Sequence, residues 1–211
     1  LEAAELQDEA EAAEPTASNA TVLASGTCGA DGDNLTWVVD DTWTLTTSGS
    51  GAMANYPYHD APWNSSSGDI LYLVVKEGVT SIGKCAFDYC TELMEATFPK
   101  SLKEIGDGAF VRRQYLETVR FSEGLTTIGD TAFGNCPSLT SIALPASLTT
   151  IGEGAFAACS GLTTVQIPAG VSSVSRFSFY LCENLKAINV AADNSNYYSQ
   201  DGVLFDKANQ E

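Results

Sequence analysis

The sequence has few basic residues and no long apolar segment. Ten Lys and Arg residues stand against 27 Asp and Glu residues, which gives a formal net charge of −17 at pH 7. Because so negative a surface repels phosphate groups, we expect no nucleic-acid partner and no binding to an anionic membrane. The longest apolar run, at residues 70–75, has six residues, whereas a membrane-spanning helix needs ~20. We therefore expect no membrane insertion in this segment.

Catalytic and metal-binding motifs are also missing. His59 is the only histidine, and no GxSxG, phosphate-loop or HExxH motif accompanies it. Asp60 follows His59, but adjacent side chains on an extended chain point apart, so this pair is not expected to serve a catalytic triad. The six cysteines include no CxxC pair, and they do not match a zinc site. We predict a protein that is not an enzyme and needs no metal or cofactor.

The composition nevertheless supports a folded core, since 44% of the residues are hydrophobic and 18% are charged. The acidity gathers at the ends, and residues 1–78 hold 13 acids and one base. We interpret residues 1–24 as an acidic flexible tail or spacer, with a partner-binding segment as the alternative. Because the chain starts at Leu1 and not at Met, a processed or cloned fragment is expected.

A repeat of 23 residues fills the middle of the chain, which we assign to residues 70–190. Five units follow one another without insertion, starting at Val79, Leu102, Leu125, Leu148 and Val171. A half-unit with Ile70, Leu73 and Val75 precedes them on the same frame. Repeats of this length are typical of solenoids, in which each unit buries its apolar face against its neighbours.

Three positions recur in each unit with a clear physical purpose. A β-branched residue that suits a short strand is followed by a glycine that suits either positive φ or close backbone approach. A phenylalanine follows, and we expect its ring to stack on those of neighbouring units. These positions are Ile82, Ile105, Ile128, Ile151 and Val174; Gly83, Gly106, Gly129 and Gly152, with Ser175 in the fifth unit; and Phe87, Phe110, Phe133, Phe156 and Phe179.

Cysteine occupies a fourth shared position, at Cys90, Cys136, Cys159 and Cys182, and Arg113 takes this place in the second unit. We interpret these residues as small buried hydrophobes with reduced thiols. Disulfides between residues 136 and 159, 159 and 182, or 85 and 90 remain open alternatives, because adjacent coils bring equivalent Cα atoms within range.

Each unit also contains an LxxLxL pattern, which predicts one short strand with alternate side chains turned outward onto a concave face. Glu95 and Arg120 are the only charged residues among the outward positions. The others are mostly small and polar, which suits an extended protein or glycan partner more than a deep pocket. A solvated scaffold that contacts its partner elsewhere is the alternative. The predicted binding residues are Tyr72, Glu95, Thr97, Thr118, Arg120, Ser141, Thr164, Gln166 and Asn189, with Val74, Ala143 and Ala187 between them.

Residues 25–69 are predicted to form a β-rich cap over the open end of the stack. The run from Leu35 to Thr47, LTWVVDDTWTLTT, predicts a β-hairpin. Tyr56, Tyr58 and Trp63 form a candidate platform for sugar rings, and the alternative is that these rings pack an irregular cap.

Residues 191–211 are predicted to form a C-terminal cap or the start of a further segment. Their sequence DNSNYYSQDG offers Asp193 and Asp201 as calcium ligands, but the spacing matches no calcium loop and favours a turn.

The pattern IGxxAFxxCxxLxxVxIP, present as IGEGAFAACSGLTTVQIP at residues 151–168, resembles the BspA-like leucine-rich repeats of bacterial and some protozoal cell-surface proteins. The resemblance covers about residues 25–207, and Arg113 and Phe177 depart from it. With the repeat, it implies a right-handed leucine-rich-repeat solenoid, β-dominated with short turns or helical segments, preceded by a β-hairpin N-terminal cap. In such relatives the closing DGVLFDKANQE leads into further strands, so the native chain is expected to continue beyond Glu211.

The resemblance also implies a function. We expect a monomeric, non-catalytic, adhesin-like module that is secreted or displayed on the cell surface and binds an extracellular protein or glycan. Two alternatives stay open: a carbohydrate-binding accessory domain of a larger secreted enzyme, and a passive spacer.

Overall fold

The computed structural model describes residues 20–208. These residues form β-strands joined by turns, and no helix is present among them. The predicted β-dominated fold is confirmed, with turns where the sequence also allowed helical segments. The strands are β1 (Val22–Gly29), β2 (Gly32–Asp40), β3 (Thr44–Gly49), β4 (Gly51–Ala52), β5 (Tyr72–Val75), β6 (Val79–Ile82), β7 (Glu95–Thr97), β8 (Glu104–Ile105), β9 (Thr118–Arg120), β10 (Thr127–Ile128), β11 (Thr150–Ile151), β12 (Thr164–Ile167), β13 (Ser173–Val174), β14 (Ala187–Val190), β15 (Tyr197–Gln200) and β16 (Val203–Asp206).

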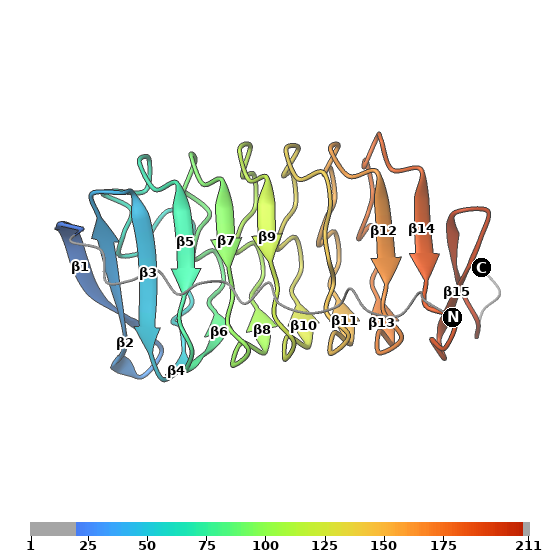
Figure 1. The fold of residues 1–211 in the computed structure, drawn as a ribbon, viewed down its shortest axis with the longest axis horizontal. Coiled ribbons are helices and arrows are strands. Elements are labelled where there is room, and N and C mark those ends of the chain that lie inside the picture. The colour runs from blue at the N-terminus through green and yellow to red at the C-terminus, as the bar shows by residue number, and fades with distance from the viewer. Residues whose placement is uncertain (1–19, 209–211) are drawn as a thin grey trace, which may run out of the picture.

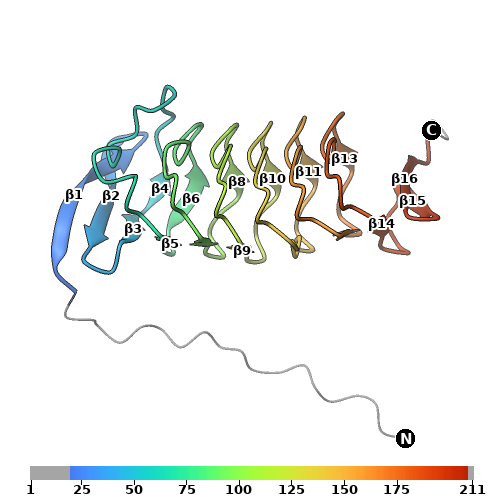
Figure 2. The same ribbon diagram turned by 90° about the horizontal axis from the view of Figure 1, so that it is seen from above.

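The 23-residue units stack as successive coils of a solenoid. Coil 1 begins at Val79, and coils 2 to 5 begin at Leu102, Leu125, Leu148 and Val171. One row of parallel strands contains β5, β7 and β9 and continues at β12 and β14, and a second row contains β6, β8, β10, β11 and β13. Paired residues in consecutive coils lie 23 positions apart in both rows. Figures 1 and 2 show the coils side by side in an almost straight stack.

The phenylalanines of the five coils form one continuous stack of rings through the core. Neighbouring rings have centroids 5.0–5.6 Å apart and interplanar angles of 1–17°. This confirms that equivalent side chains lie over one another. The stack also gains a ring from outside the repeat, since the indole of Trp63 lies 5.0 Å from Phe87 at an angle of 12°. Trp63 therefore joins the segment before coil 1 to the core.

The repeated glycines serve close backbone approach and not positive φ. None of them has a positive φ. A Cβ on Gly83 would lie 1.7 Å from the carbonyl oxygen of Ala54, and one on Gly152 would lie 2.6 Å from the amide nitrogen of Asp130. Positive φ instead recurs two residues after the glycine position, at 50–61°, a feature not predicted from the sequence. The residues in this left-handed conformation are Cys85, Gly108, Thr131, Gly154 and Phe177.

The N-terminal end is built from three antiparallel strands. β2 pairs with β1 and with β3, and β3 then pairs in parallel with β5, which attaches this end to the solenoid. The hairpin predicted between Leu35 and Thr47 is confirmed, and its turn is held by Asp40, whose carboxylate accepts a 2.9 Å hydrogen bond from the Thr42 amide. β1 starts at Val22, so residues 22–24 belong to a strand and not to the predicted tail. Residues 1–19 of that tail lie outside the described residues.

The C-terminal end is an antiparallel hairpin of β15 and β16, which confirms the turn interpretation of residues 192–202. The buried side chain of Asn194 ties the hairpin to coil 5. Its amide donates to the carbonyls of Pro168 and Val171 at 2.8 and 2.9 Å, and its oxygen accepts from the amides of Asn196 and Tyr197 at 2.8 Å each.

The six cysteines are all buried and free. In coils 3 to 5 each Sγ of the shared position lies 3.1–3.3 Å from a carbonyl oxygen of the preceding coil, as a thiol donor would. Burial raises the pKa of Cys90 to about 12 and that of Cys182 to about 11. These contacts support the interpretation of the column as small core residues.

Candidate functional site

The alternate outward residues of the first row of strands form a continuous surface, which we call the sheet face. None of these twelve residues is buried, whereas Leu73, Ala96, Val119, Ile142 and Val165 between them are. The predicted alternation is therefore confirmed. The face is nearly straight and not visibly concave, because the coils follow one another without strong curvature (Figures 1 and 2). Its residues are Tyr72, Val74, Glu95, Thr97, Thr118, Arg120, Ser141, Ala143, Thr164, Gln166, Ala187 and Asn189.

The sheet face continues onto the N-terminal strands, which the sequence analysis did not foresee. The register of β3 and β5 places Thr44 beside Tyr72 and Thr46 beside Val74. The intervening Leu45 is fully buried, so β3 follows the same inward and outward alternation as the coils. The alternating pattern of residues 44–47 carried this signal, but their distance of 28 residues from β5 hid it from a search at a period of 23.

Glu95 and Arg120 form an ion pair on the sheet face. The Nε of Arg120 donates to Oε1 of Glu95 at 2.7 Å. The register of β7 and β9 explains the contact, since Arg120 lies opposite Thr97 and thus diagonally across from Glu95. Because both side chains are partly in water, the pair adds little stability. Its main effect is to orient the guanidinium, whose terminal nitrogens remain available to a partner.

A hollow of about 340 Å³ lies beside this ion pair. It is lined by residues 117–121 of β9 and its flanks and by Ser141 and Ala143 of coil 3. Three predicted binding residues, Thr118, Arg120 and Ser141, therefore meet in one place. No strand is assigned at residues 141–143, so the sheet is interrupted between β9 and β12 next to the hollow.

The remaining predicted binding residues lie further along the face and outside this hollow. Tyr72 is 41% exposed at the start of β5. Gln166 of β12 donates to the carbonyl of Ile167 at 3.4 Å, and Asn189 is exposed on β14. The face thus offers contacts spread over several coils, with one local depression.

The predicted aromatic platform does not form. Trp63 is fully buried, and its Nε1 donates to the carbonyl of Ala86 at 3.0 Å. Tyr56 is half-buried and its hydroxyl donates to the carbonyl of Cys28 at 3.2 Å, while burial raises the pKa of Tyr56. Tyr58 is 62% exposed. Two of the three rings therefore pack the N-terminal end, as the alternative interpretation expected.

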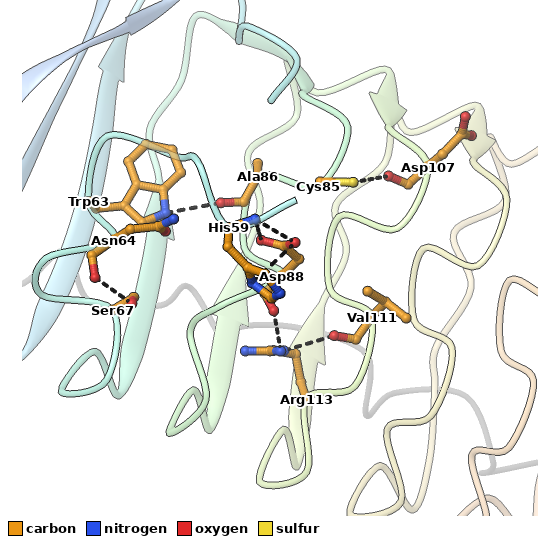
Figure 3. A network of polar contacts seen from close by, with 10 residues as sticks. All are labelled: His59, Trp63, Asn64, Ser67, Cys85, Ala86, Asp88, Asp107, Val111 and Arg113. Atoms are coloured by element: carbon orange, nitrogen blue, oxygen red, sulfur yellow. Dashed lines mark hydrogen bonds and ion pairs between the residues drawn. The ribbon is translucent and has the colours of Figure 1, made fainter. Parts of the chain in front are cut away.

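His59 is held by an acid that the sequence analysis did not consider. The buried carboxylate of Asp88 accepts the amide of His59 at 3.1 Å and lies 3.7 Å from its Nδ1, so Asp88 and not Asp60 faces the imidazole (Figure 3). The signal was weak, because the two residues are 29 positions apart and belong to different structural units.

Arg113 lies below the same site and is 3% exposed. Its guanidinium donates to the carbonyls of Asp88 and Val111, and burial lowers its pKa (Figure 3). Nη1 has no hydrogen-bond partner within the described part of the chain. Arg113 thus replaces a core cysteine by linking coils 1 and 2 through backbone carbonyls.

Two further observations concern the described residues as a whole. Residues 20–208 contain no group of three or more His, Cys, Asp and Glu side chains placed to hold a metal ion. Within the same range, no helix has the length and apolarity to cross a membrane.

The chain is similar to bacterial leucine-rich repeat proteins of known structure. A leucine-rich repeat protein from Eubacterium ventriosum is 31% identical, with a TM-score of 0.80 over 87% of this chain and 49% of that one. The leucine-rich repeat protein of T. pallidum is 26% identical, with a TM-score of 0.58 over 77% of this chain and 81% of that one. A leucine-rich cell surface protein from Faecalibacterium prausnitzii is 22% identical, with a TM-score of 0.57 over 89% and 60%, and shows the fold alone.

The chain spans about half the length of the Eubacterium ventriosum relative. No curated protein sequence matches it significantly. The pattern described as the BspA type leucine rich repeat region matches residues 80–201 in six copies, one more than the five units counted from the sequence. This match covers more than half of the chain and agrees with the stacked coils, so the chain belongs to the BspA-type leucine-rich repeat family.

Proposed function

We propose that this chain is a non-catalytic, adhesin-like interaction module that binds an extracellular protein or glycan across the sheet face. The observation that carries the proposal is the continuous row of twelve unburied, mostly polar side chains on regularly spaced strands. Such a surface offers hydrogen bonds along a line without a deep pocket. A secreted or cell-surface location and a monomeric state are parts of the same proposal, and family membership supports the location.

The dimensions of the sheet face favour an extended partner. With ~4.8 Å between strands and ~3.3 Å per residue, the face measures about 40 by 13 Å when β2 and β3 are included, or about 500 Å². A stable contact between two globular proteins needs about 800 Å² on each partner. A glycan chain or an extended peptide matches the long, narrow shape better than a compact protein does.

The absence of catalysis is also proposed on chemical grounds. The sheet face offers one acid and one base, Glu95 and Arg120, and each already engages the other at 2.7 Å. The buried acid beside His59 accepts backbone hydrogen bonds. These arrangements position side chains and leave no free general acid and base facing each other on the sheet face.

A binding screen with two matched variants tests the proposal. The wild-type chain is applied to a glycan array and to immobilised extracellular matrix proteins. Each probe that binds is then measured with Tyr72→Ala/Glu95→Ala/Arg120→Ala/Gln166→Ala. The control variant is Ser81→Ala/Glu104→Ala/Thr127→Ala/Ser173→Ala, which changes outward residues of the second row of strands.

We expect the sheet-face variant to bind at least about tenfold more weakly, because it loses several polar contacts of ~1 kcal/mol each. The control variant should bind like the wild type. Equal binding by both variants would exclude the sheet face as the contact surface. A chain that binds none of the probes would support the passive spacer.

Trp63→Ala cannot distinguish the carbohydrate-accessory alternative, although an exposed ring at this position was the reason for considering it. Trp63 is fully buried against Phe87, so its removal would report on folding. The exposed Tyr58 is the informative residue of the three, and it belongs to a different surface.

A further inference from the structure

A second hollow, of about 490 Å³, lies where the N-terminal segment meets the turns of coils 2 and 3. It is lined by Tyr58, His59, Val111, Arg112 and Thr131. These residues come from the loop that precedes coil 1 and from the turns that follow β8 and β10, so the hollow shares no residue with the sheet face. Its volume falls in the range of small-ligand sites, about 300–1,000 Å³.

The hollow exists partly because coil 2 has no side chain at its floor. A Cβ on Gly108 would lie 3.8 Å from the Tyr58 hydroxyl and 3.9 Å from Oγ1 of Thr131. Gly108 has a φ of 60°, but the equivalent Thr131 and Phe177 adopt the same conformation with φ of 50° and 59°. A side chain is therefore tolerated in this column, and its absence at Gly108 leaves open space beneath Tyr58.

The lining is positive in a strongly negative protein. It contains Arg112 and His59 but no acid, although the chain carries 27 acids and 10 bases. The nearby acids are already engaged, since Asp88 accepts the His59 amide and Asp107 pairs with Lys84 at 3.6 Å. None of the ion pairs found within residues 20–208 involves Arg112. The hollow thus presents an uncompensated guanidinium, which favours an anionic ligand.

Backbone geometry holds Arg112 in place. Its φ is 62°, and its amide donates to the carbonyl of Gly134 in the next coil at 2.7 Å. The same left-handed conformation recurs at Asn135, Ala158 and Leu181. The direction of the Arg112 side chain is therefore set by the repeat, while its identity is particular to coil 2.

Three partly exposed rings border this guanidinium. Tyr58 is 62% exposed, Tyr89 is 46% exposed, and the side chain of His59 is 59% exposed. The His59 ring lies 4.7 Å from Tyr89 and 6.1 Å from Tyr58. Exposed aromatic rings next to a cation provide both an apolar surface for ring C–H groups and a partner for a carboxylate.

We propose that this hollow binds a pyranose sugar that carries a carboxylate, such as a uronic or sialic acid unit of an acidic glycan. Arg112 receives the carboxylate through two parallel N–H donors. Tyr58 packs against the sugar ring, and the hydroxyl of Thr131 and the imidazole of His59 are placed for hydroxyl groups. The site is separate from the sheet face, so it holds or fails independently of the proposed function.

A set of matched sugars and ions tests the chemistry. The ¹⁵N-labelled chain is titrated with D-glucuronate, N-acetylneuraminate, D-glucose and sodium sulfate while amide chemical shifts are followed. Saturable shifts at residues 58–59, 111–112 and 131 with either acidic sugar support the site, and the two sugars distinguish a uronate from a sialate source. D-Glucose and sulfate should bind at least about tenfold more weakly, because each lacks one half of the recognition.

Two pairs of variants locate the site. Arg112→Ala should weaken binding of the acidic sugar at least about tenfold, and Ala is tolerated there because Ala158 has a φ of 57° in the same column. Arg176→Ala removes an exposed cation elsewhere and should have no effect. Gly108→Phe should fill the hollow and abolish binding. Gly154→Phe is its control, since Gly154 has a φ of 61° two coils away.

Several outcomes would overturn the proposal. Binding of sulfate as tightly as D-glucuronate would make the hollow a general anion site, and equal binding of D-glucose would remove the role of Arg112. Identical affinities for Arg112→Ala and Arg176→Ala would place the contact elsewhere. If no acidic sugar produces shifts at these residues, the hollow is not a sugar site.

Discussion

The ring stack supports a quantitative prediction about how stability is distributed along the solenoid. Phe133 is fully buried between Phe110 and Phe156, at 5.1 and 5.5 Å, and meets Phe121 edge-on at 5.8 Å. Phe179, at the end of the stack, is half-buried and has one stacked neighbour, Phe156, at 5.6 Å. The two residues occupy the same position in the repeat, so they form an internal comparison.

Phe133→Ala should destabilise the protein by about 3–5 kcal/mol, the usual cost of deleting a buried phenylalanine. Phe179→Ala should cost only about 1–2 kcal/mol, because less apolar area and one aromatic contact are lost. Each coil contacts chiefly its neighbours, so the larger loss should centre on coils 2 to 4.

Urea unfolding followed by circular dichroism measures the total change, and amide hydrogen exchange shows which coils lose protection. The exchange data matter because repeat proteins can unfold in parts. Equal costs for the two substitutions would show that the ring stack is not the source of the stability. Loss of protection spread evenly over all coils would refute the nearest-neighbour reasoning.

Two further predictions concern links between coils. The Glu77 carboxylate accepts the amides of Lys100 and Ser101 at 2.7 and 3.1 Å, and the first of these bonds is the main cause of its lowered pKa. A depressed pKa contributes stability above the unfolded value of about 4.3, and this contribution is lost as the pH falls through the folded value. Urea unfolding from neutral to acidic pH should therefore show a smaller acid loss for Glu77→Gln than for the wild type, and parallel curves would contradict this. Asn194→Ala should cost about 2–3 kcal/mol, because it removes four hydrogen bonds and leaves buried carbonyls unpaired; hydrogen exchange should rise in β15 and β16, and unchanged protection there would exclude Asn194 as the link to coil 5.

The coil architecture was predictable because the repeat states the same local solution many times. A residue such as Phe133 has counterparts 23 positions away on both sides, and a single translation turns this spacing into stacked rings. The outward position of Thr118 and the inward position of Val119 follow from strand alternation in the same way. The residues of the sheet face could therefore be named before their neighbours in space were known.

The sixth repeat copy was missed for a physical reason. Asn194 occupies the position that starts each coil with an aliphatic residue, and Tyr197 occupies the position of the β-branched residue. Asn194 is nevertheless buried, and the Tyr197 hydroxyl accepts the amide of Val174 at 2.9 Å. Hydrogen bonds take over from apolar contacts at the end of the stack, so a search for apolar residues ends one copy early.

What the sequence alone determined is the periodic part of the molecule: the spacing of the coils, the ring stack and the alternation of the sheet face. Only the tertiary structure decided the contacts between segments that lie off this period. Trp63 stacks on Phe87 from 24 residues away, and His59 meets Asp88 from 29. The second hollow needs the same docking, because Tyr58 and Arg112 belong to segments with different spacings. Local propensity and periodicity act along the chain, whereas the position of one segment against another depends on packing that no regular spacing encodes.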